Sequence, residues 1–309
     1  MRARLVHRPF GSPPRAAYAL LVALIVLVVA LASGCERRSE QATASDNQPH
    51  ATMRITADYG ATLLLNQPVA PNQSVMRALR GITPVRLAYG GGFVAEMFDR
   101  ASDAGGQRDW FLFHNGLLTP VGARQVPLAA GDIAWWDYRP WGALTSPWAT
   151  VGSWPAPFTG PADAVLADPP LADALAAAGA SITDRPDAPW RVRVGTNAAV
   201  AAREPAWRRA LADPVGAGLS AWIADGHIMA LDERGAARAV PDARALIAAV
   251  PSGTYPADGV VAVVVGLDRP AAERAASALA GHPNLGRDRY AAVLDGDGRV
   301  LTGGGQPTR

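Results

Sequence analysis

One aromatic stretch, residues 109–141, constrains the fold of this chain more than any other segment. Within it, Asn115-Gly116 separates two apolar runs, and Asn-Gly is the preferred pair for a two-residue hairpin turn because both positions need φ > 0. A further strand is predicted over residues 133–138, where Trp135 and Trp136 are adjacent. Four of the nine tryptophans lie in this stretch, which is too much aromatic surface for turns. The stretch is therefore either a core or a binding face.

The N-terminal segment has the pattern of an export signal. Four arginines precede an unbroken apolar run over residues 16–32, and small residues follow it. Cys35, the only cysteine, comes next, in a pattern that resembles the lipobox of bacterial lipoproteins, whose cysteine is acylated. We therefore expect residues 1–34 to be a cleaved signal peptide and Cys35 to anchor an exported protein to the outer face of the cell membrane. An uncleaved anchor helix is the alternative, because the apolar run is at the short limit for a membrane span.

The charge of the mature chain argues against a nucleic-acid partner. Removing the four arginines of residues 1–34 leaves 25 basic against 27 acidic residues, so the net charge falls from +2 to about −2. An overall basic surface that would attract nucleic acid is therefore not predicted. With a single cysteine, no disulfide can form within the chain.

Composition divides the rest of the chain into four segments. Residues 35–52 are polar and are predicted to be a disordered tether. Residues 53–141 are predicted to form a β-rich domain, and residues 142–162 a linker rich in Pro and Trp. Residues 163–309, with Ala-rich helices and Val-rich strands, are predicted to form an α/β layered domain. The expected fold class is α+β.

The β-rich domain is predicted to begin with a hairpin and a short helix. Residues 53–58 alternate between apolar and polar side chains, and residues 62–69 can pair back on them. Ser74 is a candidate N-cap, since Val75, Leu79 and Ile82 then fall on one helix face.

Three consecutive glycines, Gly90, Gly91 and Gly92, lie between Tyr89 and Phe93, after a predicted strand over residues 85–88. Glycine belongs where the backbone takes unusual φ/ψ angles or is approached closely. This loop is therefore either a tight bend between strands or a place where a ligand lies against bare backbone. Its spacing matches no dinucleotide-binding or phosphate-binding loop.

Five motifs in order carry a family resemblance. They are Asp58-Tyr59-Gly60, Tyr89-Gly90-Gly91-Gly92-Phe93-Val94, Asp109-Trp110-Phe111 with Asn115-Gly116, Val121-Gly122-Ala123, and Gly131-Asp132 through Trp136-Asp137-Tyr138. Together they resemble the transcobalamin C-terminal-like domain, a bacterial domain of unknown function similar to the smaller, β-rich domain of the vitamin B12 carriers. The resemblance covers about residues 53–141 and implies a β-grasp-like fold with cobalamin as a bound ligand. The animal carriers hold cobalamin on a large helical domain, and nothing in this chain resembles that partner.

The C-terminal part contains a weak internal repeat. One unit has a strand at 190–195, a helix at 198–211 and a hairpin at 220–235; the other has a strand at 260–265, a helix at 270–280 and a hairpin at 290–298. With an earlier strand and helix at 164–179, these units predict the layered α/β arrangement.

No catalytic or metal-binding constellation is predicted. The five histidines show no i, i+4 pair and no neighbouring cysteine. Asp295-Gly296-Asp297-Gly298 lacks the later ligands of an EF-hand loop and is predicted to be a hairpin turn. Gly195-Thr196-Asn197 is either an anion site at a helix N-terminus or an ordinary N-cap. We therefore predict that the chain is not an enzyme.

The candidate ligand site joins the glycine loop, the hairpin tip and the last strand. Its residues are Tyr89, Gly90, Gly91, Gly92, Phe93, Trp110, His114, Asn115, Trp135, Trp136 and Tyr138. Because successive strand residues point to opposite faces, Trp135 and Trp136 cannot both lie in one core, and one of them needs cover from the linker, the second domain or a ligand.

Two functions follow from this site. The first is capture of a small planar ligand, with a corrinoid such as cobalamin as the first candidate, for delivery to an importer. The second is a structural or partner-binding envelope module whose aromatic side chains are buried between domains. An enzyme in the C-terminal domain has the least support.

Overall fold

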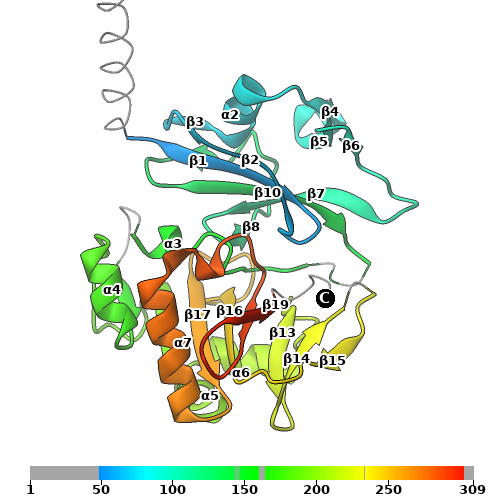
Figure 1. Cartoon of the computed structure of the whole chain (residues 1–309). Helices are drawn as coiled ribbons and strands as arrows, with labels where there is room; N and C mark the ends of the chain where they lie inside the picture. Colours follow the sequence, from blue (N-terminus) through cyan, green and yellow to red (C-terminus); the bar gives the residue numbers. More distant parts are fainter. Residues whose placement is uncertain (1–48, 143, 145, 160–163, 233, 303–309) are drawn as a thin grey trace, which may run out of the picture. The chain divides into compact units, whose positions relative to one another are not determined.

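The computed structural model of the chain describes residues 49–142, 144, 146–159, 164–232 and 234–302. The predicted signal peptide, Cys35 and nearly all of the predicted tether lie outside these residues. The described part is a mixed α+β structure with several sheets, as predicted (Figure 1). Within the described residues, no helix is both long and apolar enough to cross a membrane.

The first sheet contains five strands in the order β2-β1-β10-β7-β8. They are β1 (Ala51–Ala57), β2 (Thr62–Val69), β7 (Arg108–His114), β8 (Leu117–Leu118) and β10 (Ile133–Pro140). The central pair, β1 and β10, is parallel, and the other neighbours are antiparallel. This central place explains the dense aromatic pattern of β10, because both of its faces are covered.

Two local predictions from the sequence are confirmed. The Asn115-Gly116 turn joins β7 to β8 with φ of 49° and 83°, as a two-residue hairpin turn requires. Helix α2 (Val75–Ile82) is capped by Ser74, whose Oγ accepts a hydrogen bond from the backbone N–H of Arg77.

Short elements cover the upper face of the first sheet, beside α2 (Figure 1). They are β3 (Gln73–Ser74), β4 (Arg86–Ala88), the 3-10 turn η1 (Tyr89–Gly91), β5 (Phe93–Met97), β6 (Arg100–Ala101) and β9 (Pro127–Leu128). Met53, Ile55, Leu79 and Trp136 belong to the core between these elements and the sheet.

The second sheet contains six strands in the order β11-β12-β17-β16-β18-β19. They are β11 (Val165–Ala167), β12 (Trp190–Thr196), β16 (Ala245–Pro251), β17 (Val260–Gly266), β18 (Ala292–Leu294) and β19 (Val300–Thr302). One face packs against α4 (Leu171–Ala177) and α7 (Arg269–Gly281). The other packs against α5 (Asn197–Arg203) and α6 (Pro205–Ala212). A small sheet of β13 (Ala221–Ala224), β14 (His227–Leu231) and β15 (Ala237–Ala239) lies beside it.

The single helix predicted over residues 198–211 is wrong, because the chain forms two helices there. Glu204 has extended φ/ψ angles (−119°, 96°) and separates α5 from α6. Pro205 explains the break, since it has no N–H for the helix and disfavours helical geometry in the preceding residue. Glu204 instead caps α6 by accepting a hydrogen bond from the N–H of Ala206.

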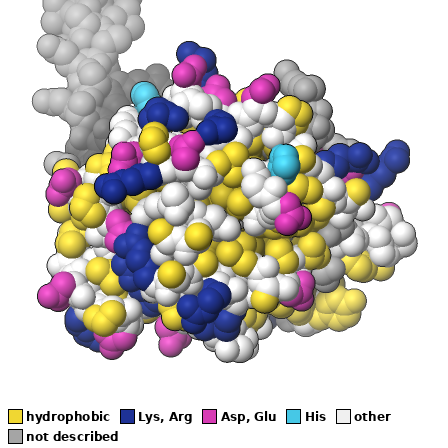
Figure 2. Space-filling model, turned by 90° about the horizontal axis from the view of Figure 1, so that it is seen from below, with side chains coloured by type: hydrophobic (Ala, Val, Ile, Leu, Met, Phe, Trp, Pro, Cys, Tyr) yellow, Lys and Arg dark blue, Asp and Glu magenta, His cyan; other side chains and the backbone are white. Residues whose placement is uncertain are grey.

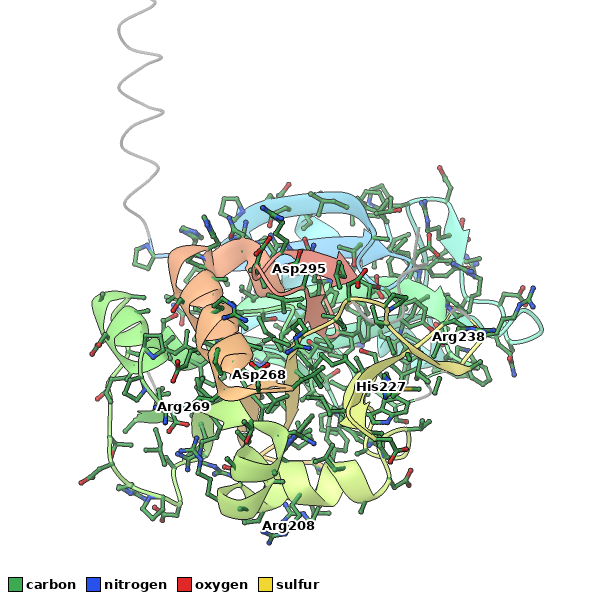
Figure 3. The ribbon with its side chains drawn as sticks, turned by 60° about the horizontal axis from the view of Figure 1, so that its bottom comes forward. Arg208, His227, Arg238, Asp268, Arg269 and Asp295 are labelled. Carbon is green, nitrogen blue, oxygen red and sulfur yellow. The ribbon has the colours of Figure 1, made fainter. Side chains whose placement is uncertain are left out.

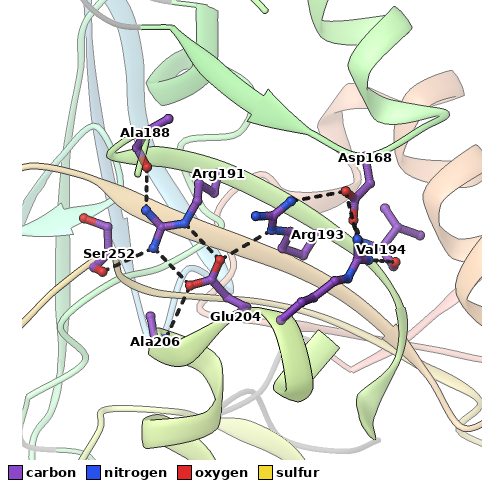
Figure 4. Close-up of polar contacts among 9 residues, drawn as sticks. Asp168, Ala188, Arg191, Arg193, Val194, Glu204, Ala206 and Ser252 are labelled. Atoms are coloured by element: carbon purple, nitrogen blue, oxygen red, sulfur yellow. Dashed lines mark hydrogen bonds and ion pairs between the residues drawn. The ribbon is translucent and has the colours of Figure 1, made fainter. Parts of the chain in front are cut away.

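Glu204 also lies at the centre of a buried ionic network (Figure 4). It accepts two hydrogen bonds from the Arg191 guanidinium, at 2.9 and 3.0 Å, and Arg193 lies 3.4 Å away. Asp168, which follows β11, pairs with Arg193 and Arg203. Burial alone would raise the pKa of Glu204, but the arginine contacts lower it below its usual value. The network thereby joins β11, β12 and both helices of this face.

The segment predicted to be a linker is packed rather than exposed where it is described. Val151, Trp154 and Phe158 are buried against the second sheet, with α3 (Ala156–Thr159) at the end of the segment. Trp148 stacks on Tyr255 at a centroid distance of 4.3 Å. The residues from Pro49 onward accordingly form one compact unit.

Candidate functional site

A groove with a volume of about 580 Å³ lies on the upper side of the first sheet, between β7 and the Tyr89–Phe93 loop. Its aromatic and apolar lining includes Tyr89, Phe93, Trp110, Val121, Trp136 and Trp141. The groove therefore brings together one end of the glycine loop, β7 and β10, while the hairpin tip, His114-Asn115, which the predicted site also included, is not among its lining residues.

The rim of the groove consists of exposed apolar side chains. Tyr89 is 87% exposed and Phe93 59%, and their rings meet edge to face at 5.7 Å. Val121, on the neighbouring loop, is 45% exposed. Large apolar groups that cluster in water around a concave surface are typical of a binding site.

The glycine loop has the unusual backbone that its sequence suggested. Gly90 and Gly91 have φ of 70° and 89°, in the left-handed region that favours glycine. The loop is therefore a bend between β4 and β5 that also contributes Gly92 to the groove. Arg124 holds this bend through a 3.2 Å hydrogen bond from Nη1 to the carbonyl of Gly90.

Trp136 forms part of the inner wall of the groove and carries an unpaired donor. The residue is only 4% exposed, and its Nε1–H has no hydrogen-bond partner among the described residues. By contrast, Trp110 Nε1 donates to the Arg100 carbonyl at 3.0 Å. Leaving a buried N–H unpaired costs about 1–3 kcal/mol.

The arginines of the groove wall are neutralised by nearby carboxylates. Arg86 pairs with Glu96 at 2.7 Å, and Arg108 pairs with Asp58. The guanidinium of Arg108 also lies over the ring of Tyr138, 5.1 Å from its centroid. These two cations are already paired, and the carboxylates of Asp103 and Asp109 also line the groove, so its wall disfavours a ligand whose bound part is anionic.

Trp135 points to the opposite face of β10 and does not line the groove. It is fully buried among Phe113, Tyr290 and the backbone of Gly152, where a side chain would collide with the indole. Its Nε1 donates to Thr56 Oγ1 at 2.8 Å. The second layer and the packed segment before it therefore provide the cover that this tryptophan needs.

Behind Trp135, Asp137 is a fully buried carboxylate. It accepts hydrogen bonds from Thr56 Oγ1 at 2.7 Å and from the Tyr290 hydroxyl at 2.9 Å. Burial raises the pKa of Asp137, and these hydrogen bonds only partly oppose the effect. The pair of Asp137 and Tyr290 joins the two sheets.

His114, Asn115 and Tyr138 have structural partners outside the groove. His114 Nε2 lies 3.0 Å from Asp132 Oδ2, and Asn115 Nδ2 donates to Asp132 Oδ1 at 2.8 Å. Burial alone would raise the pKa of Asp132, but these contacts and the Ala129 N–H lower it. The Tyr138 hydroxyl donates to the Ala101 carbonyl. These groups fix the hairpin tip and β6 in place.

Two motifs with alternative interpretations have ordinary structural roles. Asp295 lies in the turn between β18 and β19, where its Oδ1 accepts from the N–H groups of Asp297 and Arg299, so the predicted hairpin turn is confirmed (Figure 3). Thr196 caps α5 through the N–H of Ala199. Among the described residues, no three His, Cys, Asp or Glu side chains are grouped so that they could hold a metal ion.

Sequence reasoning missed two parts of the groove. Val121 belongs to a motif that was recognised, but nothing in the sequence placed it opposite Phe93. Trp141 was assigned to the end of the domain, although it lines the groove. That Val121 and Trp141 line the groove is seen only in the folded structure, where their loops come together.

The sequence matches no known protein-family model and no curated protein. Among solved structures, the chain has a weak similarity to a protein from Ruminococcus gnavus whose description proposes that it binds metal. The two are 14% identical, and the match covers 30% of this chain and 98% of the other, with a TM-score of 0.26. At this level the similarity carries no argument about fold or function.

Proposed function

We propose that this protein is an exported lipoprotein that captures a small molecule with a flat, uncharged part in the groove between β7 and the Tyr89–Phe93 loop. The observation that carries the proposal is the groove itself, where the exposed rings of Tyr89 and Phe93 form a rim beside a wall that includes Trp110 and Trp136. A volume of about 580 Å³ lies within the range of roughly 300–1,000 Å³ that is common for small-molecule sites.

Cobalamin is the first ligand to test. The resemblance of residues 53–141 to the transcobalamin C-terminal-like domain suggests it. Anchoring through Cys35 would hold the binding unit at the outer face of the membrane, where a captured ligand can pass to an importer. The structural alternative is supported by the burial of Trp135 and Trp136 in two cores, whereas the exposed rings of Tyr89 and Phe93 favour capture.

The test is binding of cobalamin and of N-phenyl-1-naphthylamine, a neutral flat probe, followed by tryptophan quenching and probe fluorescence. Phe93→Ala removes an exposed ring from the rim of the groove. We expect it to weaken cobalamin binding by roughly 5- to 10-fold, as for the loss of one aromatic contact of about 1 kcal/mol. Leu63→Ala, on β2 and outside the groove, is the matched control, because its side chain is exposed to a similar degree, and it should leave binding unchanged.

The outcomes separate the parts of the proposal. Binding of the naphthylamine without cobalamin would keep the groove as a small-molecule site and reject the corrinoid. Binding of neither probe at high micromolar concentration would reject small-molecule capture and favour the structural module. The lipid anchor is tested separately, because Cys35→Ser should abolish lipid labelling and leave an unprocessed precursor.

A further inference from the structure

A second hollow, of about 630 Å³, lies on the other side of the glycine loop from the groove. Arg77 and Arg80 of α2 and Arg124 of the loop before β9 contribute its charged side chains, and Ser74, Gly81 and Gly91 are among its other lining residues. The hollow and the groove share no lining residue. Gly91 borders the hollow, and Gly92 borders the groove.

The hollow contains three cations and no carboxylate among its lining residues. None of these three arginines forms an ion pair with any described acidic residue. Arg54, Arg86, Arg108 and Arg191, for comparison, each have a carboxylate within 3.0 Å. On the face seen in Figure 2, too, basic and acidic side chains are interspersed. What distinguishes Arg77, Arg80 and Arg124 is that three arginines without a carboxylate partner among the described residues line the same hollow.

The positive charges of three arginines around one hollow repel one another unless an anion is bound between them. Arg77 and Arg80 are three residues apart and lie on one face of α2, a spacing at which like charges repel by a few tenths of a kcal/mol. Arg124 approaches from another segment, and its Nη1 is oriented by the hydrogen bond to Gly90. A bound anion would offset the repulsion among all three groups.

The hollow is open beside the end of α2 and is bordered by Arg124 beside the glycine loop. A side chain at Gly81 would meet no atom within 4 Å, so the space beside the helix there is open. At Gly91 a Cβ atom would lie 3.2 Å from Arg124 Nη1. Guanidinium groups bind oxyanions through paired N–H donors, and three of them match the several oxygens of a phosphate group.

We propose that Arg77, Arg80 and Arg124 form a site for a phosphate-type oxyanion, separate from the groove. The proposal does not depend on what the groove binds. The shared chemistry is a phosphate group, carried either by a soluble molecule or by the headgroup of an anionic phospholipid.

The first experiment measures binding of inorganic phosphate to the full-length chain by calorimetry at constant ionic strength. We expect Arg80→Gln or Arg124→Gln to weaken binding by roughly 10- to 100-fold, as for the loss of a charge-assisted contact. Arg208→Gln is the matched control for Arg124→Gln, because Arg208 is also exposed and donates to a backbone carbonyl at 3.2 Å, but on α6, where Figure 3 shows it. Arg209→Gln, in the last turn of α6, is the control for Arg80→Gln.

The second experiment distinguishes the sources of the phosphate group. Stronger cosedimentation with phosphatidylglycerol vesicles than with phosphatidylcholine vesicles, with the difference lost in Arg77→Gln/Arg80→Gln, would assign the site to a lipid headgroup, because the predicted N-terminal anchor would bind both kinds of vesicle alike. Phosphate binding without such a difference would assign it to a soluble phosphate. The proposal is overturned if phosphate does not bind and the two kinds of vesicle cosediment alike, or if the control variants weaken binding as much as Arg80→Gln and Arg124→Gln. The arginines are exposed, so a thermal melt should show all four single variants folded.

Discussion

The neighbouring residues Trp135 and Trp136 lie on opposite faces of the first sheet and have different surroundings. On the lower face, Trp135 is fully buried, contacts Tyr290 and donates its N–H to Thr56. On the upper face, Trp136 is nearly as buried, yet its N–H has no partner among the described residues and its side chain borders the groove. Burial alone therefore does not distinguish the two tryptophans, because both belong to apolar cores. They differ in whether the indole N–H has a partner and in whether the side chain borders the groove.

The lower face also shows how the fold accommodates polar groups that must be buried. Asp137 is held by Thr56, Tyr290 and the N–H of Gly60. The guanidinium of Arg139 lies 3.7 Å from the centroid of the Phe111 ring and donates to the Leu144 carbonyl. These contacts connect the sheet to the layer below, although Nε and Nη2 of Arg139, like Nε1 of Trp136, have no hydrogen-bond partner among the described residues.

Trp135→Ala gives the largest effect that the comparison predicts. Removing a fully buried indole should lower the free energy of unfolding by about 3–5 kcal/mol. Chemical denaturation measures the loss, and the same substitution at Trp136 should cost less, because that side chain already borders an open groove. Equal losses for the two alanine variants would contradict this difference between the two faces of the sheet.

Asp137→Asn sharpens the comparison through pH. Burial raises the pKa of Asp137 in the folded state. The stabilisation that comes from protonating Asp137 is therefore fully present below its unfolded pKa, about 3.9, and is lost as the pH rises through its folded pKa. Between pH 4 and pH 7, the stability of the wild type should therefore fall relative to that of Asp137→Asn. Urea denaturation at both pH values measures the difference. Arg139, Tyr290 and Asp288 are present in both proteins, so the comparison isolates Asp137. A constant difference between the proteins would show that Asp137 does not titrate as its burial requires.

Tyr89→Ala should have the smallest effect on stability. The ring is 87% exposed, so its loss should change the free energy of unfolding by no more than about 0.5 kcal/mol. If the rim takes part in capture, the same change should weaken binding of a groove ligand by roughly 5-fold or more, since an aromatic contact contributes about 1 kcal/mol. Thermal melting and probe titration, with Leu63→Ala on the exposed side of β2 as control, separate the two effects. A large loss of stability would place Tyr89 in the fold rather than in a site.

Local patterns in the sequence predicted much of the first sheet. The Asn115-Gly116 turn, the Ser74 cap and the strand that carries Trp135 and Trp136 depend on neighbouring residues, so they could be read directly. The α+β class followed from the same patterns. The alternation along β10 also showed that its two tryptophans must have different surroundings.

Long-range contacts could not be predicted in the same way. Nothing near Trp135 in the sequence indicates that Tyr290 covers it. Likewise, nothing near Glu204 indicates that this residue binds Arg191 in addition to capping α6. β16 is buried on both faces, so it lacks the alternation that identifies a half-exposed strand. The hollow of Arg77, Arg80 and Arg124 depends on the approach of two segments that are far apart in the chain.

The distance along the chain between Asp137 and Tyr290, 153 residues, has a consequence for synthesis. A ribosome delivers the N-terminal half first, and contacts between distant residues form slowly because a long loop must close. The strands of the first sheet are complete once Pro140 has been made, but Trp135 and Phe113 then have no cover from below. Until Tyr290 follows, this apolar face stays exposed to water and to other nascent chains. The risk of aggregation during translation is therefore concentrated in the half of the protein that is finished first.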